Sequence, residues 1–231
     1  MKHEVVLEIH GLAKQYGGLR PLRIERLDLH AGESLALLGF DRVSAEVLVD
    51  LITGATLPDS GEVHVFGRST RAIQDGDDWL TSLDRIGILS ERAVLLDQMT
   101  VEQNLAIPFS LDLDPIPVTV HARVQALARE VGIQDVELPH LVADLSDMAR
   151  LRLRLARAIA LKPYLLLSEH PNAVASAAES LEFAKDLARV QSERRFASLT
   201  LVADTRFAKA VADRVLTHDP VTGKFKGRWF L

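Results

Sequence analysis

The sequence predicts an α/β fold with a buried parallel sheet, and three observations support this prediction. Short apolar runs of the kind found in fully buried strands occur at residues 34–38, 164–167 and 199–203. Each run is followed by a segment with the apolar spacing of a helix, at residues 45–53, 177–194 and 207–212. The first thirty residues alternate between apolar and polar types, which indicates antiparallel strands. We therefore expect an α/β fold that combines a parallel core with an antiparallel β-subdomain and a helical subdomain.

The N-terminal part of the chain contains the predicted antiparallel strands and the first strand of the core. The alternating apolar residues are Val5, Leu7 and Ile9, followed by Leu22, Ile24, Leu27 and Leu29. The core strand at 34–38 ends at Gly39, and a short loop joins it to the helix at 45–53. The turn-rich sequence at 57–61 then precedes another strand at 63–66.

The middle of the chain, from about residue 75 to residue 161, has mostly helical patterns. Thr100 and Gln103 have the spacing of a capping box, which predicts the start of a helix. Further helices are expected at 120–131 and 147–161, and a strand at 85–90. We expect one domain over residues 1–231. Within it, residues 76–161 form the helical subdomain, and residues 1–75 and 162–231 form the core and the β-subdomain, with short strands from Val215 to the end.

Composition excludes several classes of site. The 231 residues include no cysteine, which rules out disulfides and thiolate chemistry and is compatible with a reducing cytosol. No uncharged apolar run is long enough to predict a membrane span. The net charge of −5 gives no global field that would recruit nucleic acid, so we expect no nucleic-acid partner. The eight histidines form no i,i+4 pair, and we expect no metal site.

The segment from Gly39 to Glu46 has the position of a phosphate-binding loop but lacks most of its chemistry. Such loops read G-x-x-x-x-G-K-[ST], in which lysine holds phosphates and the hydroxyl binds Mg²⁺. Here Gly39 fits, whereas Ser44 replaces the second glycine, Ala45 the lysine and Glu46 the hydroxyl. A carboxylate at Glu46 would repel phosphate oxygens by about 4 kcal/mol at 4 Å and an effective dielectric near 20. Arg42 is the one residue of the loop that could supply a positive charge.

The order of these segments resembles the ATP-binding cassette of ABC transporters along nearly the whole chain. The matching stretches are residues 14–18, 32–39, 51–63, 99–105, 145–146, 152–161, 165–171 and 212–216. The resemblance implies a P-loop NTPase-like fold with a RecA-like core, an antiparallel β-subdomain, and a helical subdomain that meets a membrane partner.

The resemblance also assigns positions to the remaining site residues. Glu169 stands at the catalytic carboxylate, directly after Ser168, which replaces the family's metal-binding aspartate. Ser146 is the serine of the family signature, whose two glycines are here Asp147 and Met148. The other family positions are occupied by Tyr16 at the adenine-stacking aromatic, Glu91 at the switch glutamine and Asp204 at the switch histidine.

Since most of these positions have lost the family's residue type, we expect a transporter subunit with weak or absent ATP hydrolysis. Glu169 is then a vestigial catalytic residue, no cofactor is used, and the chain acts in assembly or regulation. The expected partners are a membrane permease subunit, a second cassette, or both, and the second cassette includes another copy of this chain. We expect the chain to be cytoplasmic, peripheral to the inner face of the membrane through a permease.

Two alternatives remain open. In the first, the chain is a live ATPase that uses ATP and Mg²⁺ with unusual residues, Arg42 for the lysine and Glu91 and Glu169 for the metal. In the second, the chain is a regulatory module, and the cleft that binds nucleotide in the family binds another ligand here.

Overall fold

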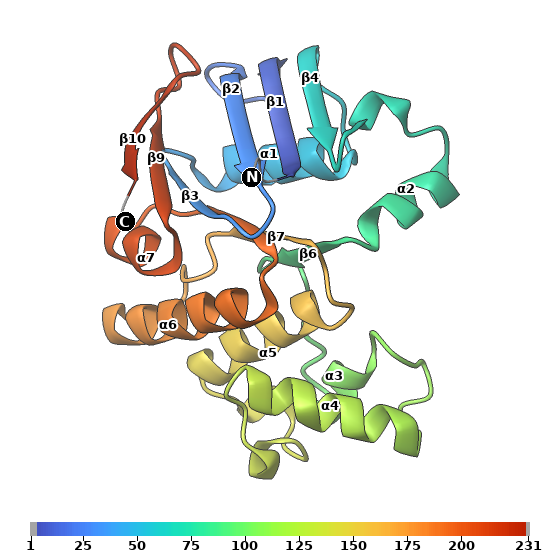
Figure 1. Cartoon of the computed structure of the whole chain (residues 1–231). Coiled ribbons are helices and arrows are strands. Elements are labelled where there is room, and N and C mark those ends of the chain that lie inside the picture. Colours follow the sequence, from blue (N-terminus) through green and yellow to red (C-terminus); the bar gives the residue numbers. More distant parts are fainter. Residues whose placement is uncertain (1–3, 230–231) are drawn as a thin grey trace.

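The computed structural model describes residues 4–229, which form two β-sheets and seven α-helices (Figure 1). The smaller sheet has four antiparallel strands in the order β2-β1-β4-β5. These strands are β1 (Val5–Lys14), β2 (Leu22–His30), β4 (Ser60–Val65) and β5 (Arg68–Ser69). In the register of β1 and β2, Leu7 lies opposite Leu29 and Ile9 opposite Leu27, so the alternating apolar residues share one face. The predicted antiparallel subdomain is confirmed.

The larger sheet has six strands in the order β10-β9-β3-β8-β7-β6, parallel except for β10. They are β3 (Ser34–Leu38), β6 (Ile86–Leu89), β7 (Leu165–Glu169), β8 (Ala197–Leu201), β9 (Arg214–His218) and β10 (Phe225–Trp229). The three central strands β3, β8 and β7 are the predicted apolar runs. The last two residues of the predicted C-terminal strands, 230–231, lie outside the described residues.

The helices are α1 (Arg42–Thr53), α2 (Gly76–Leu83), α3 (Val101–Ala106), α4 (Val118–Glu130), α5 (Asp147–Ile159), α6 (Ala177–Arg194) and α7 (Thr205–Val211). Single 3-10 turns occur at Thr70–Ala72, Asp135–Glu137 and Val142–Asp144. The capping box opens α3 as predicted, because Thr100 and Gln103 exchange hydrogen bonds of 2.9 and 3.1 Å.

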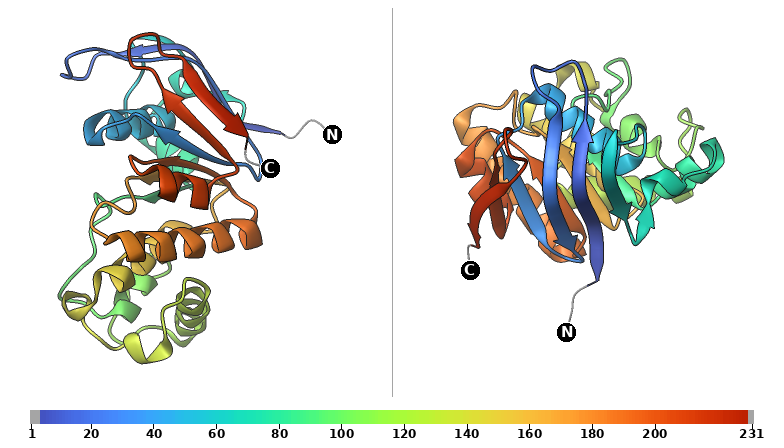
Figure 2. Two further views of the ribbon diagram at one scale, coloured as in Figure 1. Left: turned by 90° about the vertical axis from the view of Figure 1, so that its left-hand side faces the viewer. Right: turned by 90° about the horizontal axis from the view of Figure 1, so that it is seen from above.

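Two apolar cores lie on opposite faces of the six-stranded sheet. Leu35 and Leu37 of β3 pack with α1 and the antiparallel sheet, whereas Ala36 faces the core formed with α5, α6 and α7. The same alternation along β7 places Leu166 in the second core. Figure 2 shows the resulting layers, with the antiparallel sheet above, the parallel sheet in the middle and the helices below.

Four predicted helices, those at 45–53, 120–131, 147–161 and 207–212, have limits that differ from the observed ones by one to three residues. The helix predicted at 45–53 begins at Arg42, because Asp41 caps it. The helix predicted at 147–161 ends at Ile159. The proposed subdomain limits remain a prediction, although β6, inside the 76–161 segment, lies in the large sheet. None of the helices in the described part of the chain is long and apolar enough to cross a membrane.

Candidate functional site

The loop after β3 turns at Gly39, where the backbone requires a glycine. Gly39 has φ of +90°, and a Cβ there would lie 2.8 Å from the carbonyl oxygen of His218. The ring of the next residue, Phe40, stacks on the His218 imidazole with centroids 4.6 Å apart. These contacts fix the loop against β9 and set the start of α1.

The N-terminus of α1 is capped by a carboxylate of the same chain. Asp41 accepts hydrogen bonds from the Ser44 amide at 2.7 Å and from the Ser44 hydroxyl at 2.6 Å. These bonds, the hydroxyl first, hold the pKa of Asp41 below its ordinary value of 3.8. A helix N-terminus is a favourable position for a phosphate, but here Asp41 already supplies the anion. Ala45 is fully buried in the core and offers no polar group.

Arg92 lies at the centre of the site and contacts three carboxylates. Its Nε donates to Glu169 Oε2 at 3.0 Å, and its Nη2 contacts Glu169 Oε1. Its other contacts, each of 3.2 Å, reach Glu46 and Asp50, one turn apart on α1. Hydrogen bonding to Glu169 raises the pKa of Arg92, against the opposing effect of burial. With three carboxylates to one guanidinium, the cluster keeps a negative excess that opposes a phosphate.

Glu169 is buried at the carboxyl end of β7, with 8% of its surface exposed. Besides Arg92, it accepts a 2.6 Å hydrogen bond from the Ser90 hydroxyl at the end of β6. Both carboxylate oxygens are therefore bound by side chains of the same subunit. A carboxylate held in this way is poorly placed to accept a proton from water.

The cavity beside this cluster is small, and some buried polar atoms near it have no hydrogen-bond partner among the described residues. A cavity of about 30 Å³ is lined by residues that include Glu46, Glu91 and Glu169. This volume is about that of one water molecule. Among the described residues, Glu91 Oε1, Ser168 Oγ and His170 Nε2 are buried without a hydrogen-bond partner. These atoms are available to a small polar ligand such as water.

Arg42 also lines this cavity, but its side chain lies on the solvent-exposed side and is not free to replace the lysine. Its guanidinium pairs with Glu91 and is mostly exposed, at 74%. The pair joins two residues that sequence analysis proposed separately as phosphate and metal contacts. Each now partly neutralises the other.

Two of the remaining predicted site residues cap helices, and the third, Tyr16, packs against the core of the antiparallel sheet. Ser146 caps α5 by accepting from the Ala149 amide at 3.3 Å, and Asp204 caps α7 by accepting from the Arg206 amide at 2.7 Å. Neither makes a hydrogen bond or ion pair with the Arg92 cluster within residues 4–229. Tyr16 is half-buried. Burial first, and then the charge of Asp41, raises the pKa of Tyr16 above its ordinary value.

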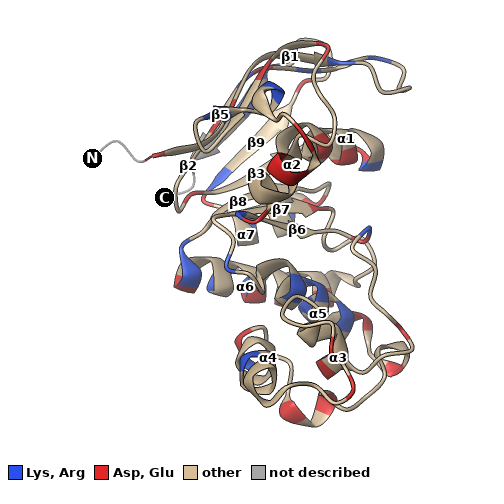
Figure 3. Ribbon diagram, turned by 90° about the vertical axis from the view of Figure 1, so that its right-hand side faces the viewer, with Lys and Arg blue, Asp and Glu red and all other residues tan. Residues whose placement is uncertain are grey.

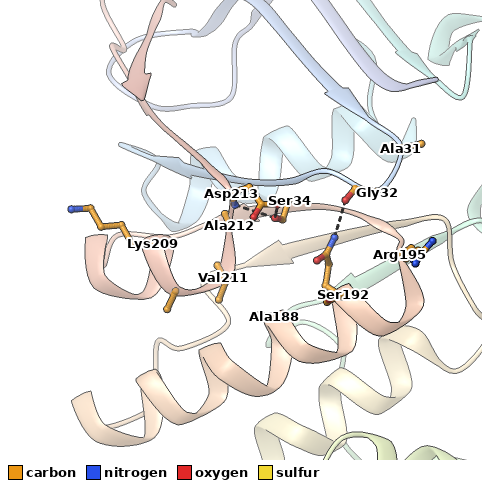
Figure 4. Close-up of a pocket in the computed structure, with 12 residues that line it drawn as sticks. Ala31, Gly32, Ser34, Ala188, Ser192, Arg195, Lys209, Val211, Ala212 and Asp213 are labelled. Carbon is orange, nitrogen blue, oxygen red and sulfur yellow. Dashed lines mark hydrogen bonds between the residues drawn. The ribbon is translucent and has the colours of Figure 1, made fainter. Parts of the chain in front are cut away.

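Within residues 4–229, no group of three or more His, Asp or Glu residues is arranged to hold a metal ion. Figure 3 shows acidic residues on α1 and α2 and basic residues along α5. A larger pocket of about 710 Å³ lies at the amino end of β3, between α6 and α7, and thus at the opposite edge of the sheet from the loop (Figure 4). Its Ser34 and Asp213 are bonded to each other at 2.6 Å, and it has no part in the candidate site.

Comparison with known proteins identifies the protein family to which this chain belongs. A model described as "ABC transporter" matches residues 22–173. The chain belongs to the ABC transporter family. It is 31% identical to the sulfate/thiosulfate import ATP-binding protein CysA of Bradyrhizobium diazoefficiens, over 93% of this chain and 61% of that protein. It is 25% identical to the methionine import ATP-binding protein MetN of Brucella abortus, over 93% of this chain and 57% of that protein. The chain thus spans about three fifths of the length of these relatives.

Solved structures show the same fold for this ABC family member. The cassette cbiO1 of Clostridium perfringens, described as part of the transporter complex cbiONQ, superposes with a TM-score of 0.82 at 19% identity, covering 98% of this chain and 89% of its own. The dimeric cassette MJ0796, bound to ADP and phosphate, gives a TM-score of 0.78 at 17% identity, covering 97% and 99%. These likenesses confirm the predicted P-loop NTPase-like fold with its antiparallel and helical parts.

The expectation that no cofactor is used was wrong. The family model is that of ABC transporters, and the relatives are named ATP-binding proteins, so ATP with Mg²⁺ is the ligand that the family implies. The expectation relied on missing loop residues, which bear on the phosphate end of the ligand alone.

The side chains of the site suit the adenine end of ATP and do not suit its phosphate end. Tyr16 packs, half-buried, against the apolar core of the antiparallel sheet, and an aromatic ring is the type of group on which a base stacks. At the phosphate end, the fit fails because Asp41 occupies the helix N-terminus and Arg92 fills the space between Glu46 and Glu169. The structure therefore supports no catalytic step through a bound triphosphate.

Sequence analysis missed Arg92 altogether. A signal was available in Glu46 and Asp50, an acidic pair at i,i+4 spacing on one face of a helix, which needs a cation from elsewhere. Arg92 follows the predicted strand at 85–90 by two residues, so its guanidinium could be expected at the same sheet edge as Glu169.

Proposed function

We propose that this chain is the ATP-binding-cassette subunit of a membrane transporter in which hydrolysis at its own phosphate loop is weak or absent. ATP is its ligand, a permease and a second cassette are its partners, and its place is the cytoplasmic face of the membrane. Its role is then in assembly or regulation of the transporter. The observation that carries the proposal is the pairing of Arg92 with both oxygens of Glu169.

The transporter assignment is supported by family membership and by the names of the relatives, which are import ATP-binding proteins. The assignment of weak hydrolysis is supported by the chemistry of the site. Phosphoryl transfer depends on positioning and on neutralising the charge of the phosphates. Here the loop supplies a buried alanine in place of a cation, and its one exposed cation, Arg42, is paired with Glu91.

The test is phosphate release by the purified chain with Mg²⁺ and ATP, together with the melting temperature. We expect ATP to raise the melting temperature, because any ligand that binds only the folded state stabilises it. We expect phosphate release at background rate, with the same rate for Glu169→Gln. Arg150→Gln is the matched control, since it breaks an ion pair with Asp97 away from the site.

A second function, a live ATPase with unusual residues, is favoured by the names of the relatives and by the retention of Glu169. In that case phosphate release lies well above background and falls by about a hundredfold or more in Glu169→Gln. That result would reject the proposal of weak hydrolysis while leaving the transporter assignment in place.

A further inference from the structure

A separate pocket of about 240 Å³ lies between the end of α1, the β4–β5 hairpin, α2 and the start of β6. None of its lining residues belongs to the Arg92 cluster. Its walls are largely apolar and include Ile52, Val65, Ile73 and Ile86. Mostly apolar walls with a few polar groups are typical of pockets that bind small molecules.

One polar group inside the pocket is buried and unsatisfied. Thr70 lines the pocket with 4% of its surface exposed, and its Oγ1 has no hydrogen-bond partner among residues 4–229. Leaving a buried hydroxyl unpaired destabilises a protein by about 1–3 kcal/mol. Other hydroxyls of the wall are satisfied, since those of Thr81 and Ser82 donate to backbone carbonyls within α2 at 2.9 and 2.6 Å. Among the described residues that line this pocket, Thr70 therefore has the one buried hydroxyl without a hydrogen-bond partner.

An arginine also lines the pocket. The Arg85 guanidinium lies 3.9 Å from the ring centroid of Phe66 and 4.6 Å from that of Tyr164. Within residues 4–229 no carboxylate pairs with it. The other lining arginine, Arg68, is fully engaged by both oxygens of Asp78 at 2.6 Å and by the Ala72 carbonyl at 2.7 Å. Arg85 is thus a positive charge held in place by aromatic rings and open to an anion.

We propose that this pocket binds a small carboxylic acid with an apolar body. The carboxylate pairs with Arg85, the body lies among the isoleucine and valine walls, and Thr70 hydrogen-bonds a polar atom of the ligand. A volume of 240 Å³ equals that of about eight water molecules, which suits a body of roughly ten heavy atoms. This site does not depend on the proposed function.

One wall of the pocket can yield to admit such a ligand. No residue of α2 is fully buried, and the helix is held to α1 by a 3.0 Å hydrogen bond from Trp79 Nε1 to the Thr53 carbonyl. Segments with few buried side chains open at low free energy. A ligand that contacts both α1 and α2 would therefore make α2 more rigid.

The experiment compares phenylpropionate with phenylpropanol, an uncharged molecule of similar shape, by saturation-transfer NMR and calorimetry up to about 10 mM. We expect saturable binding of the acid and at least about tenfold weaker binding of the alcohol. Arg85→Gln should weaken binding of the acid by about tenfold and leave the alcohol unchanged. The control Arg20→Gln removes the same charge from an exposed loop and should have no effect.

Thr70→Val removes the hydroxyl at nearly constant volume and should weaken binding of the acid by a few-fold, as the loss of one hydrogen bond predicts. It also provides a readout if Arg85→Gln fails to fold. The absence of saturable binding by the acid overturns the proposal. Equal binding of acid and alcohol overturns the assignment to carboxylic acids, as does unchanged affinity in a folded Arg85→Gln variant.

Discussion

Arg92 and Glu169 form a two-point ion pair at the carboxyl end of strand β7. The pair joins the segment after β6 to the core of the large sheet. It also links Glu169 to α1, because the same guanidinium contacts Glu46 and Asp50. One side chain thus connects the segment after β6, strand β7 and helix α1.

Removal of Arg92 should destabilise the fold. Arg92→Ala leaves Glu169 buried with one hydrogen bond, and loss of a charged hydrogen-bond partner predicts a decrease of about 2 kcal/mol in the free energy of unfolding. Urea denaturation measures this decrease. Arg150→Ala, which breaks the more exposed pair with Asp97, should change stability by less than about 1 kcal/mol. Equal decreases in the free energy of unfolding for the two variants would show that the Arg92–Glu169 pair contributes no more to stability than the Arg150–Asp97 pair.

Substitution of Gly39 should be costly because two effects combine there. Gly39→Ala places a methyl group 2.8 Å from the His218 carbonyl at a φ of +90°. Gly67→Ala is the matched control, since Gly67 has φ of +78° but open space around its Cα. We expect Gly39→Ala to lower the free energy of unfolding by about 2 kcal/mol, and by more than the control. Thermal or urea unfolding of both variants decides the matter, and a control that is equally destabilised would assign the whole effect to backbone strain.

The cap formed by Asp41 should make stability depend on pH in acid. Its folded-state pKa lies below the ordinary 3.8 because Ser44 donates two hydrogen bonds to the carboxylate. The stabilisation is therefore present above pH 3.8 and is lost as pH falls through the lower folded-state value. Asp41→Asn keeps a capping oxygen without this titration, so its free energy of unfolding should fall less steeply below about pH 4. Equal slopes for the two proteins would contradict the assignment.

His218 should make stability depend on pH in a higher range than Asp41 does. Burial lowers its pKa below 6.5, although its 2.7 Å hydrogen bond to the Arg23 carbonyl opposes this effect. Between 6.5 and the lower folded-state pKa, the unfolded chain holds more protons, so stability falls as pH decreases. His218→Gln should remove this part of the slope. The exposed His10→Gln variant should retain it, and NMR titration of the His218 ring should show a midpoint below the ordinary pKa of 6.5.

Most of the fold could be predicted because its determinants are local. Apolar runs such as Leu165–Leu167 indicate a strand that is buried on both faces. The alternation along Val5–Lys14 indicates a strand that is buried on one face. The loop could also be located, since Gly39 follows a buried strand. The arrangement within the site could not be predicted, because the partners of Arg92 come from α1 and β7, which lie 42 and 77 positions away in the chain. Such contacts depend on side-chain directions that a sequence pattern does not specify.

The most direct test is a crystal structure of the chain with Mg²⁺ and a non-hydrolysable ATP analogue. We expect the nucleotide to be bound with Arg92 still paired to Glu169. An Arg92 side chain displaced from Glu169, with a magnesium ion and a water molecule ordered beside that carboxylate, would contradict the account.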